Sequence, residues 1–218
     1  MIPGEDACCI LLYGDIGEYS DVTAIVRELM EAEASGKRID VRINSNGGDV
    51  YTGIAIFNAL RGSKADIHIY VDGIAASMAS VIALCGKPVE MSKYARLMLH
   101  SVSGGCYGNK TELRRCLEEV EALENTLCEM YAPKLGTSVE DIRARYFDDA
   151  DHWLKADEAL ALGFIDGVYD ADPVPEDSTP EQVYCIFNNR LEQPLNDTQM
   201  NLEEVKKRPR FKDCATDS

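Results

Sequence analysis

Two residues of the sequence have types and positions that suit nucleophilic catalysis. Ser77 lies in the segment GIAASMAS at 73–80, where small residues allow a sharp turn before a helix begins. This arrangement has the mechanics of a nucleophile elbow, although it lacks the G-x-S-x-G sequence. His100 ends the apolar segment LMLH, and a neutral imidazole can take the proton of a serine hydroxyl near pH 7. The pair indicates acyl transfer; the alternatives are that Ser77 only caps its helix and that His100 is structural.

A glycine pair adds a third chemical feature. Gly47 and Gly48 follow the predicted strand Ile39–Ile43, and glycine backbone can adopt conformations closed to other residues and approach a substrate closely. The Gly48 amide, together with free amides at the start of the Ser77 helix, can hold a developing oxyanion. The sequence therefore contains a nucleophile, a base and oxyanion donors at three separate junctions.

These junctions lie where predicted strands give way to turns and helices. Apolar runs predict strands at Ala7–Tyr13, Ile39–Ile43, Ile67–Val71 and Leu97–His100. Apolar residues at helical spacing predict helices between Asp21 and Gly36, from Val50 to Leu60, and at Ser77–Leu84. The alternation predicts an α/β domain with a parallel sheet, in which ligands bind at the carboxyl ends of the strands.

A long helix is predicted at Lys110–Tyr131, and a shorter one at Asp157–Leu162. The apolar stripe of the long helix consists of Leu113, Leu117, Val120, Leu123 and Leu127. Periodicity leaves open whether this stripe packs on its own sheet or on a neighbouring subunit.

Composition excludes several classes of protein. The 218 residues carry 22 basic and 38 acidic side chains, a formal charge of −16, which argues against binding to nucleic acid or to an anionic membrane surface. No apolar run reaches the length of a membrane span, and the acidic start of the chain is unlike a signal peptide. The eight cysteines form no C-x-x-C pair, so we expect reduced thiols in a cytoplasmic protein with no metal and no cofactor.

The composition changes at about residue 170. Residues 1–170 carry the alternating pattern and are expected to form the catalytic domain. Residues 171–218 begin with an acidic, proline-rich stretch that is typical of a linker, and near their end stands the basic run KKRPRFKD. We expect this part to be a C-terminal extension, either a linker or a scaffold-like tail.

Four motifs together resemble the Clp protease proteolytic-subunit family of serine peptidases. They are INSNGGDV at 43–50, GIAASMAS at 73–80, LMLH at 97–100 and DHWLKADEALALGFID at 151–166. The resemblance implies a Clp protease/crotonase-like spiral of β-β-α units with a mainly parallel sheet and a protruding long helix. It also implies polypeptide substrates and a homo-oligomer of stacked rings, usually of seven subunits.

The same resemblance assigns roles to individual residues. It implies Ser77 as nucleophile, His100 as general base and Asp151 as the residue that orients His100. It further implies the backbone amides of Gly48 and Met78 as donors to the oxyanion. Asp148 and Asp149 lie within three residues of Asp151, and either could take its role if the loop bends differently.

Departures from the housekeeping pattern point to a particular branch. The segment HSVSGGCYG lacks the Gln-Pro that usually follows the histidine, and only Met1–Asp6 precede the first predicted strand. With the extension, these features resemble head maturation proteases of phages and prophages, which act on scaffold and capsid proteins, and they make an ATPase unfoldase a doubtful partner. The alternatives are an ATPase-dependent Clp subunit, an enoyl-CoA hydratase/isomerase-like enzyme and an inactive assembly protein.

Overall fold

Helices and strands alternate along the chain in the computed structural model, which describes residues 2–3, 7–17 and 22–169. The strands are β1 (Ile2–Pro3), β2 (Ala7–Tyr13), β3 (Arg38–Ser45), β4 (Ile67–Ala76), β5 (Val89–Ser92), β6 (Arg96–Leu99), β7 (His152–Lys155) and β8 (Gly167–Tyr169). The helices are α1 (Val22–Ser35), α2 (Val50–Gly62), α3 (Met78–Ala83), α4 (Lys110–Leu135), α5 (Val139–Tyr146) and α6 (Ala156–Ala161). The predicted α/β class with a mostly parallel sheet is confirmed.

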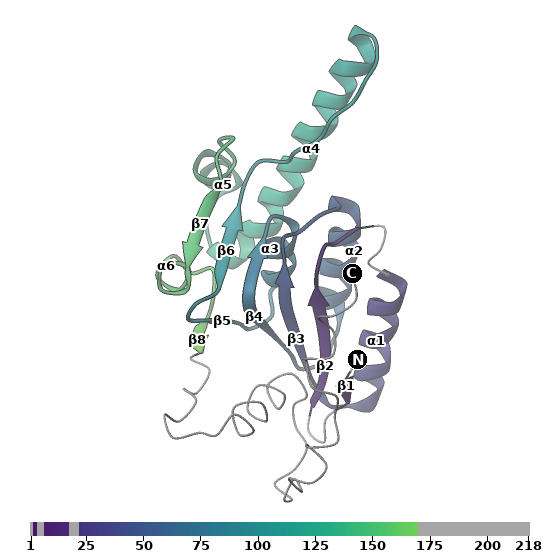
Figure 1. Ribbon diagram of the computed structural model, residues 1–218, viewed down its shortest axis with the longest axis vertical. Helices are drawn as coiled ribbons and strands as arrows, with labels where there is room; N and C mark the ends of the chain where they lie inside the picture. Colours follow the sequence, from purple (N-terminus) through teal and green to yellow (C-terminus); the bar gives the residue numbers. More distant parts are fainter. Residues whose placement is uncertain (1, 4–6, 18–21, 170–218) are drawn as a thin grey trace, which may run out of the picture.

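Strand β4 pairs with β3 along one edge and with two strands, β5 and β6, along its other edge. The sheet runs β1-β2-β3-β4-β5-β8, and all of these pairs except β1-β2 are parallel. The first half of β4 pairs with β5, from Ile69 to Val71, and its second half pairs with β6, from Ile74 to Ala76. Strand β7 then joins β6 in antiparallel sense. This second pairing places the carboxyl ends of β4 and β6 next to each other (Figure 1).

One face of the sheet forms the core with the helices. In β2, Cys8, Ile10 and Leu12 are buried, whereas the alternate residues Leu11 and Tyr13 are exposed. The buried side chains cluster with apolar residues of the helices, and α3 is buried along its whole length. Met78, the first residue of α3, directly follows Ser77, so the burial of α3 fixes the backbone next to Ser77.

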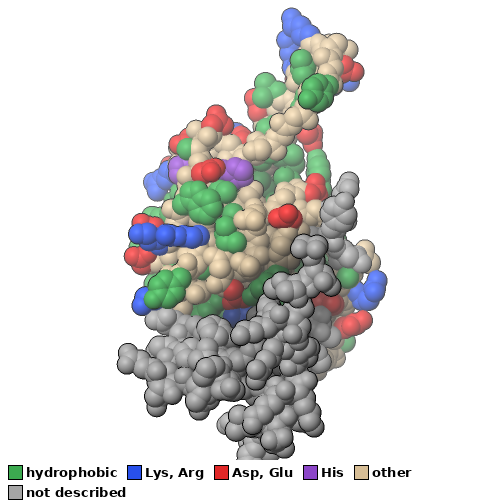
Figure 2. Space-filling model, in the orientation of Figure 1, with side chains coloured by type: hydrophobic (Ala, Val, Ile, Leu, Met, Phe, Trp, Pro, Cys, Tyr) green, Lys and Arg blue, Asp and Glu red, His purple; other side chains and the backbone are tan. Residues whose placement is uncertain are grey.

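Helix α4 extends away from the body of the molecule (Figures 1 and 2). It begins with a capping box between Asn109 and Glu112 and ends at Gly136 in the left-handed conformation, beyond the predicted end at Tyr131. Its last third is anchored, because Leu127, Cys128 and Tyr131 are buried. The first part of the apolar stripe lies outside this core, with Leu113 47% and Leu117 58% exposed.

Several short elements were not predicted from the sequence. These are β1, β5, α5, β7 and β8, none longer than eight residues. The patterns of α5, β7 and β8 are weak because few of their side chains are buried; α5, for example, buries only Ile142. Strand β5 has only four residues, too few for a clear pattern. The predicted extension at 171–218 lies outside the described residues. Among the helices of residues 22–169, none has the length and apolar character that a membrane crossing requires.

Candidate active site

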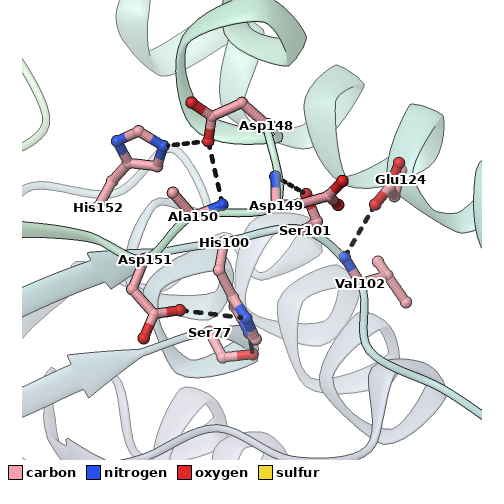
Figure 3. A network of polar contacts seen from close by, with 10 residues as sticks. All are labelled: Ser77, His100, Ser101, Val102, Glu124, Asp148, Asp149, Ala150, Asp151 and His152. Carbon is pink, nitrogen blue, oxygen red and sulfur yellow. Dashed lines mark hydrogen bonds and ion pairs between the residues drawn. The ribbon is translucent and has the colours of Figure 1, made fainter.

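Strand pairing brings the candidate residues together from distant parts of the sequence. Ser77 directly follows β4, whose Ala76 pairs with Met98 of β6 in parallel. His100 directly follows β6, and Asp151 directly precedes β7. Leu99 pairs with His152 in antiparallel sense, so the next residue on each strand, His100 on one and Asp151 on the other, also lies side by side with its counterpart. The three side chains therefore meet at one edge of the sheet (Figure 3).

Ser77 occupies a strained turn at the start of α3. Its φ of 52° and ψ of −125° lie outside the regions that L residues ordinarily occupy, a strain of about 1–3 kcal/mol. Its side chain forms no cap to α3, so the alternative reading of Ser77 as an ordinary N-cap is wrong. Its amide donates to the Met98 carbonyl at 2.9 Å, which continues the pairing of β4 with β6 through the turn. The hydroxyl is thereby held at the end of the strand.

The buried hydroxyl groups of Ser80 and Tyr131 form hydrogen bonds that hold this turn. The Ser80 hydroxyl donates to the Ser77 carbonyl at 2.6 Å and also lies 2.6 Å from the Tyr131 hydroxyl. Tyr131 comes from α4 and is 2% exposed, and its burial raises the pKa of its phenol. Ser80 and Tyr131 thus tie the strained turn to the anchored third of α4, and sequence reasoning missed this role for both residues.

His100 links the serine to a carboxylate. The Nε2 atom of His100 lies 2.7 Å from Oγ of Ser77, and its Nδ1 atom lies 3.8 Å from Oδ1 of Asp151 (Figure 3). The imidazole is 25% exposed, but the Asp151 side chain is 59% exposed. In the tautomer with its proton on Nδ1, His100 faces the carboxylate with a donor and the serine with an acceptor.

Of the three neighbouring aspartates, Asp151 is the one that faces His100. Asp148 instead contacts His152, with 2.7 Å between its Oδ1 and Nε2, and this hydrogen bond lowers the pKa of the Asp148 carboxyl. The Asp149 amide donates to the hydroxyl of Ser101 at 3.0 Å, and Asp149 has a positive φ of 66°. Ser101 is buried and directly follows His100, so it ties the aspartate loop to the histidine strand; its type and position gave no signal of this in the sequence.

Gly47 packs tightly against the Ser77 turn, and Gly48 packs against the backbone of Ile16. A Cβ on Gly47 would lie 2.8 Å from the Met78 nitrogen, and one on Gly48 would lie 1.8 Å from the Ile16 carbonyl oxygen. Both glycines have positive φ, 93° and 145°. Backbone hydrogen bonds hold the pair, since the Ile16 amide donates to the Gly47 carbonyl at 2.8 Å and the Asp49 amide donates to the Ile16 carbonyl at 2.5 Å. A side chain at either position would displace this loop or the turn beside it.

A cavity of about 140 Å³ lies beside the Ser77 hydroxyl. Gly48 and Met78 line it together with Ser77 and His100, and Ser101–Ser103 form another part of its wall. The Ser77 amide already donates to the Met98 carbonyl. Met78 is the first residue of α3, so its amide has no acceptor within the helix. The cavity therefore places a hydroxyl, an imidazole and helix-start backbone around one small volume.

Comparison with known proteins gives the family. The family model described as Clp protease matches residues 6–172. The chain belongs to the Clp protease family. An ATP-dependent Clp protease proteolytic subunit of Bacteroides fragilis is similar to this Clp protease, with 33% identity over 162 residues, 73% of this chain and 77% of the relative. Subunit 1 of Prochlorococcus marinus (strain NATL2A) is 31% identical over 169 residues, 76% of this chain and 85% of the relative.

Family membership settles the class of reaction. This Clp protease is a Clp-type proteolytic subunit and hence a serine-type endopeptidase, a hydrolase. The prediction of a serine peptidase is confirmed, and the alternative of an enoyl-CoA hydratase/isomerase-like enzyme is set aside. The matched range of 6–172 also includes all four motifs from which the resemblance was drawn.

Proposed function

We propose that this Clp protease hydrolyses polypeptides with Ser77 as nucleophile, His100 as general base and Asp151 as the group that orients His100. The observation that carries this proposal is the 2.7 Å contact between Ser77 Oγ and His100 Nε2, formed by a serine that does not cap its helix. Asp151, on the other side of the imidazole at 3.8 Å, supports the Nδ1-protonated tautomer.

The proposed reaction follows from these positions. His100 Nε2 takes the hydroxyl proton as Ser77 Oγ attacks the scissile carbonyl, and the imidazolium then gives this proton to the leaving amine. Water attacks the acyl-enzyme in the second half of the reaction, again with His100 as base. Asp151 stabilises the imidazolium in both halves by its negative charge.

The amides of Gly48 and Met78 are the proposed donors to the oxyanion. Both residues line the cavity that Ser77 and His100 also line. The Met78 amide starts α3, so it carries the partial positive charge of a helix N-terminus. Gly48 has a positive φ of 145°, a backbone conformation that a residue with a side chain could adopt only with strain.

Covalent labelling tests the nucleophile. A serine-directed fluorophosphonate should modify Ser77, identified by peptide mass spectrometry, and Ser77→Ala should remove both the label and peptide hydrolysis. Ser63→Ala is the control because this serine follows α2 and does not line the cavity, and it should still be labelled at Ser77. An adduct on another serine in an active preparation would overturn the assignment.

Assembly into rings is the second part of the proposal. The protruding part of α4 exposes Leu113 and Leu117, and Tyr107 just before it is fully exposed. Figure 2 shows apolar side chains on this protruding part. Such apolar side chains on an extended helix suit contact with other subunits. Light scattering should give a mass many times 24.1 kDa. Leu113→Glu with Leu117→Glu should reduce this mass, whereas Leu160→Glu, a similarly exposed leucine on α6, should not; an unchanged mass in the double variant would contradict the role of α4.

For the biological setting we propose maturation of phage or prophage heads, with scaffold and capsid proteins as substrates. The support is the segment after His100, which lacks Gln-Pro, and the acidic, proline-rich composition after residue 170. The relatives are named ATP-dependent, which supports the competing assignment to an unfoldase-coupled protease. Incubation with scaffold protein, with and without ATP and an unfoldase, separates the two. Cleavage without ATP is expected, and cleavage only with both additions would refute the proposal.

A further inference from the structure

The segment after His100 runs beside α4 in a regular register (Figure 1). The Val102 amide donates to Glu124 Oε1 at 3.0 Å. A Cβ on Gly104 would lie 3.7 Å from a methyl group of Val120, and one on Gly108 would lie against the Glu112 side chain. Each step of two residues along the segment therefore matches a step of four residues back along the helix.

Simple geometry explains this register. Two residues of extended chain advance about 6.6 Å, and four residues of α-helix advance about 6 Å. The two steps are nearly equal, so contacts made at both ends of the segment persist in between. The position midway between the Gly104 and Gly108 contacts pairs Cys106 with Cys116. The electrostatics agree with this pairing, since the neighbouring Cys116 thiol raises the pKa of the Cys106 thiol.

The Cys106–Cys116 pair differs from the other described cysteines in its accessibility. Among the described cysteines Cys106 is the exposed one; Cys116 and Cys9 are half-buried, and Cys8, Cys85 and Cys128 are buried in the core. Burial also raises the pKa of Cys85 and of Cys128 to about 11, so few of these thiols ionise at neutral pH. An oxidant in solution can reach Cys106 directly.

We propose that Cys106 and Cys116 form a reversible disulfide that fastens the segment after His100 to α4. The oxidant is a small-molecule disulfide such as glutathione disulfide. The Cys106 thiolate attacks one of its sulfurs and releases one glutathione thiolate, and the Cys116 thiolate then attacks the Cys106 sulfur and releases the second. The protein pair loses two protons and two electrons, and one glutathione disulfide becomes two molecules of glutathione.

The disulfide would act on a wall of the active-site cavity. Ser101, Val102 and Ser103 line that cavity, and Cys106 lies three residues further on. The bond closes a short loop from Cys106 to Cys116, which restricts the open states of the segment. By the entropy of closing such a loop, we expect hydrogen exchange by local opening at residues 102–108 to slow about a hundredfold.

Oxidation of the full chain in mixtures of glutathione and glutathione disulfide tests this proposal. Peptide mapping without reductant should yield a linked Cys106–Cys116 peptide, with loss of two hydrogens from the intact mass and recovery by dithiothreitol. A second sample with Cys185→Ser and Cys214→Ser excludes competition from cysteines beyond residue 170. In Cys116→Ser, Cys106 should carry glutathione and no internal link should form, whereas Cys9→Ser should leave the link unchanged.

The contrary results are equally defined. Glutathione retained on Cys106 of the unsubstituted chain, or Cys106 linked to any cysteine other than Cys116 of the same chain, would overturn the proposal. Unchanged hydrogen exchange at 102–108 after the link has formed would overturn its role as a fastener. A hydrogen bond to Cys116 raises the pKa of the Cys106 thiol, so the linking rate should rise as the pH rises above neutrality.

Discussion

Substitution of Asp151 by asparagine tests how much the third member of the proposed triad contributes. The change keeps the size of the side chain but removes the negative charge that faces His100 Nδ1 at 3.8 Å. In the transition state His100 becomes an imidazolium, so the variant loses an attraction that is present mainly when the reaction proceeds. We therefore expect kcat to fall while KM changes little.

The structure sets the size of this effect. Two unit charges 3.8 Å apart attract by about 1 kcal/mol in water and by about 4 kcal/mol at an effective dielectric constant of about 20. Because the Asp151 side chain is 59% exposed, the value lies toward the lower bound. A loss of roughly 1.4–2.7 kcal/mol corresponds to a fall in kcat of about 10- to 100-fold. This is well below the loss of about 10⁴-fold seen where a triad aspartate is buried.

Initial rates on a short fluorogenic peptide, measured against titrated active sites, give kcat and KM for each variant. Asp148→Asn and Asp149→Asn are the matched controls, since both lie in the same loop; the Asp148 carboxylate contacts His152, and Asp149 bonds to Ser101 through its backbone amide. Both should retain most of the activity. Full activity in Asp151→Asn, or a larger loss in Asp149→Asn, would refute the assignment of the acid.

Three further substitutions probe the supports of the site. Gly48→Ala places a Cβ 1.8 Å from the Ile16 carbonyl oxygen at a φ of 145°, so urea unfolding should show a loss of about 3 kcal/mol. Tyr131→Phe removes the hydroxyl that contacts Ser80, and should cost about 1 kcal/mol of stability and lower kcat more than it changes KM; equal kcat values would contradict this. Asp49→Ala removes the cap of α2 and should cost about 1 kcal/mol at pH 7. Hydrogen bonds from the first turn lower the Asp49 pKa, so the difference from the unsubstituted chain should shrink as the pH falls through that lowered pKa.

The proximity of Ser77 and His100 was predictable because the sheet is mainly parallel. Ser77 and His100 both stand at the ends of apolar runs, and in a parallel sheet such ends lie along one edge. The Ser80 and Tyr131 hydroxyls could not be found in this way. Their roles depend on how α4 packs against α3, and a tyrosine in an apolar helical stripe gives no sign that its hydroxyl meets a serine.

The acid was harder to predict from the sequence. Three aspartates stand within four residues, and composition does not separate them. The choice depends on the antiparallel pairing of β6 with β7, two strands of four residues each. Strand β7 buries little of its surface and shows no apolar run, so its existence and register follow from tertiary contacts alone.

The two halves of the proposed triad are therefore held by different means. The contact of Ser77 with His100, at 2.7 Å, joins the ends of two paired parallel strands, and the Ser77 amide adds a further hydrogen bond of that pairing. The contact of His100 with Asp151, at 3.8 Å, joins the end of β6 to the residue before β7, and it also depends on the loop at 148–150, whose Asp149 amide donates to Ser101. The contact of Ser77 with His100 is therefore set by the sheet, whereas the contact of His100 with Asp151 also depends on the loop. We therefore expect a displacement of the Asp151 loop to change the rate through the orientation of His100, while the contact between Ser77 and His100 is kept.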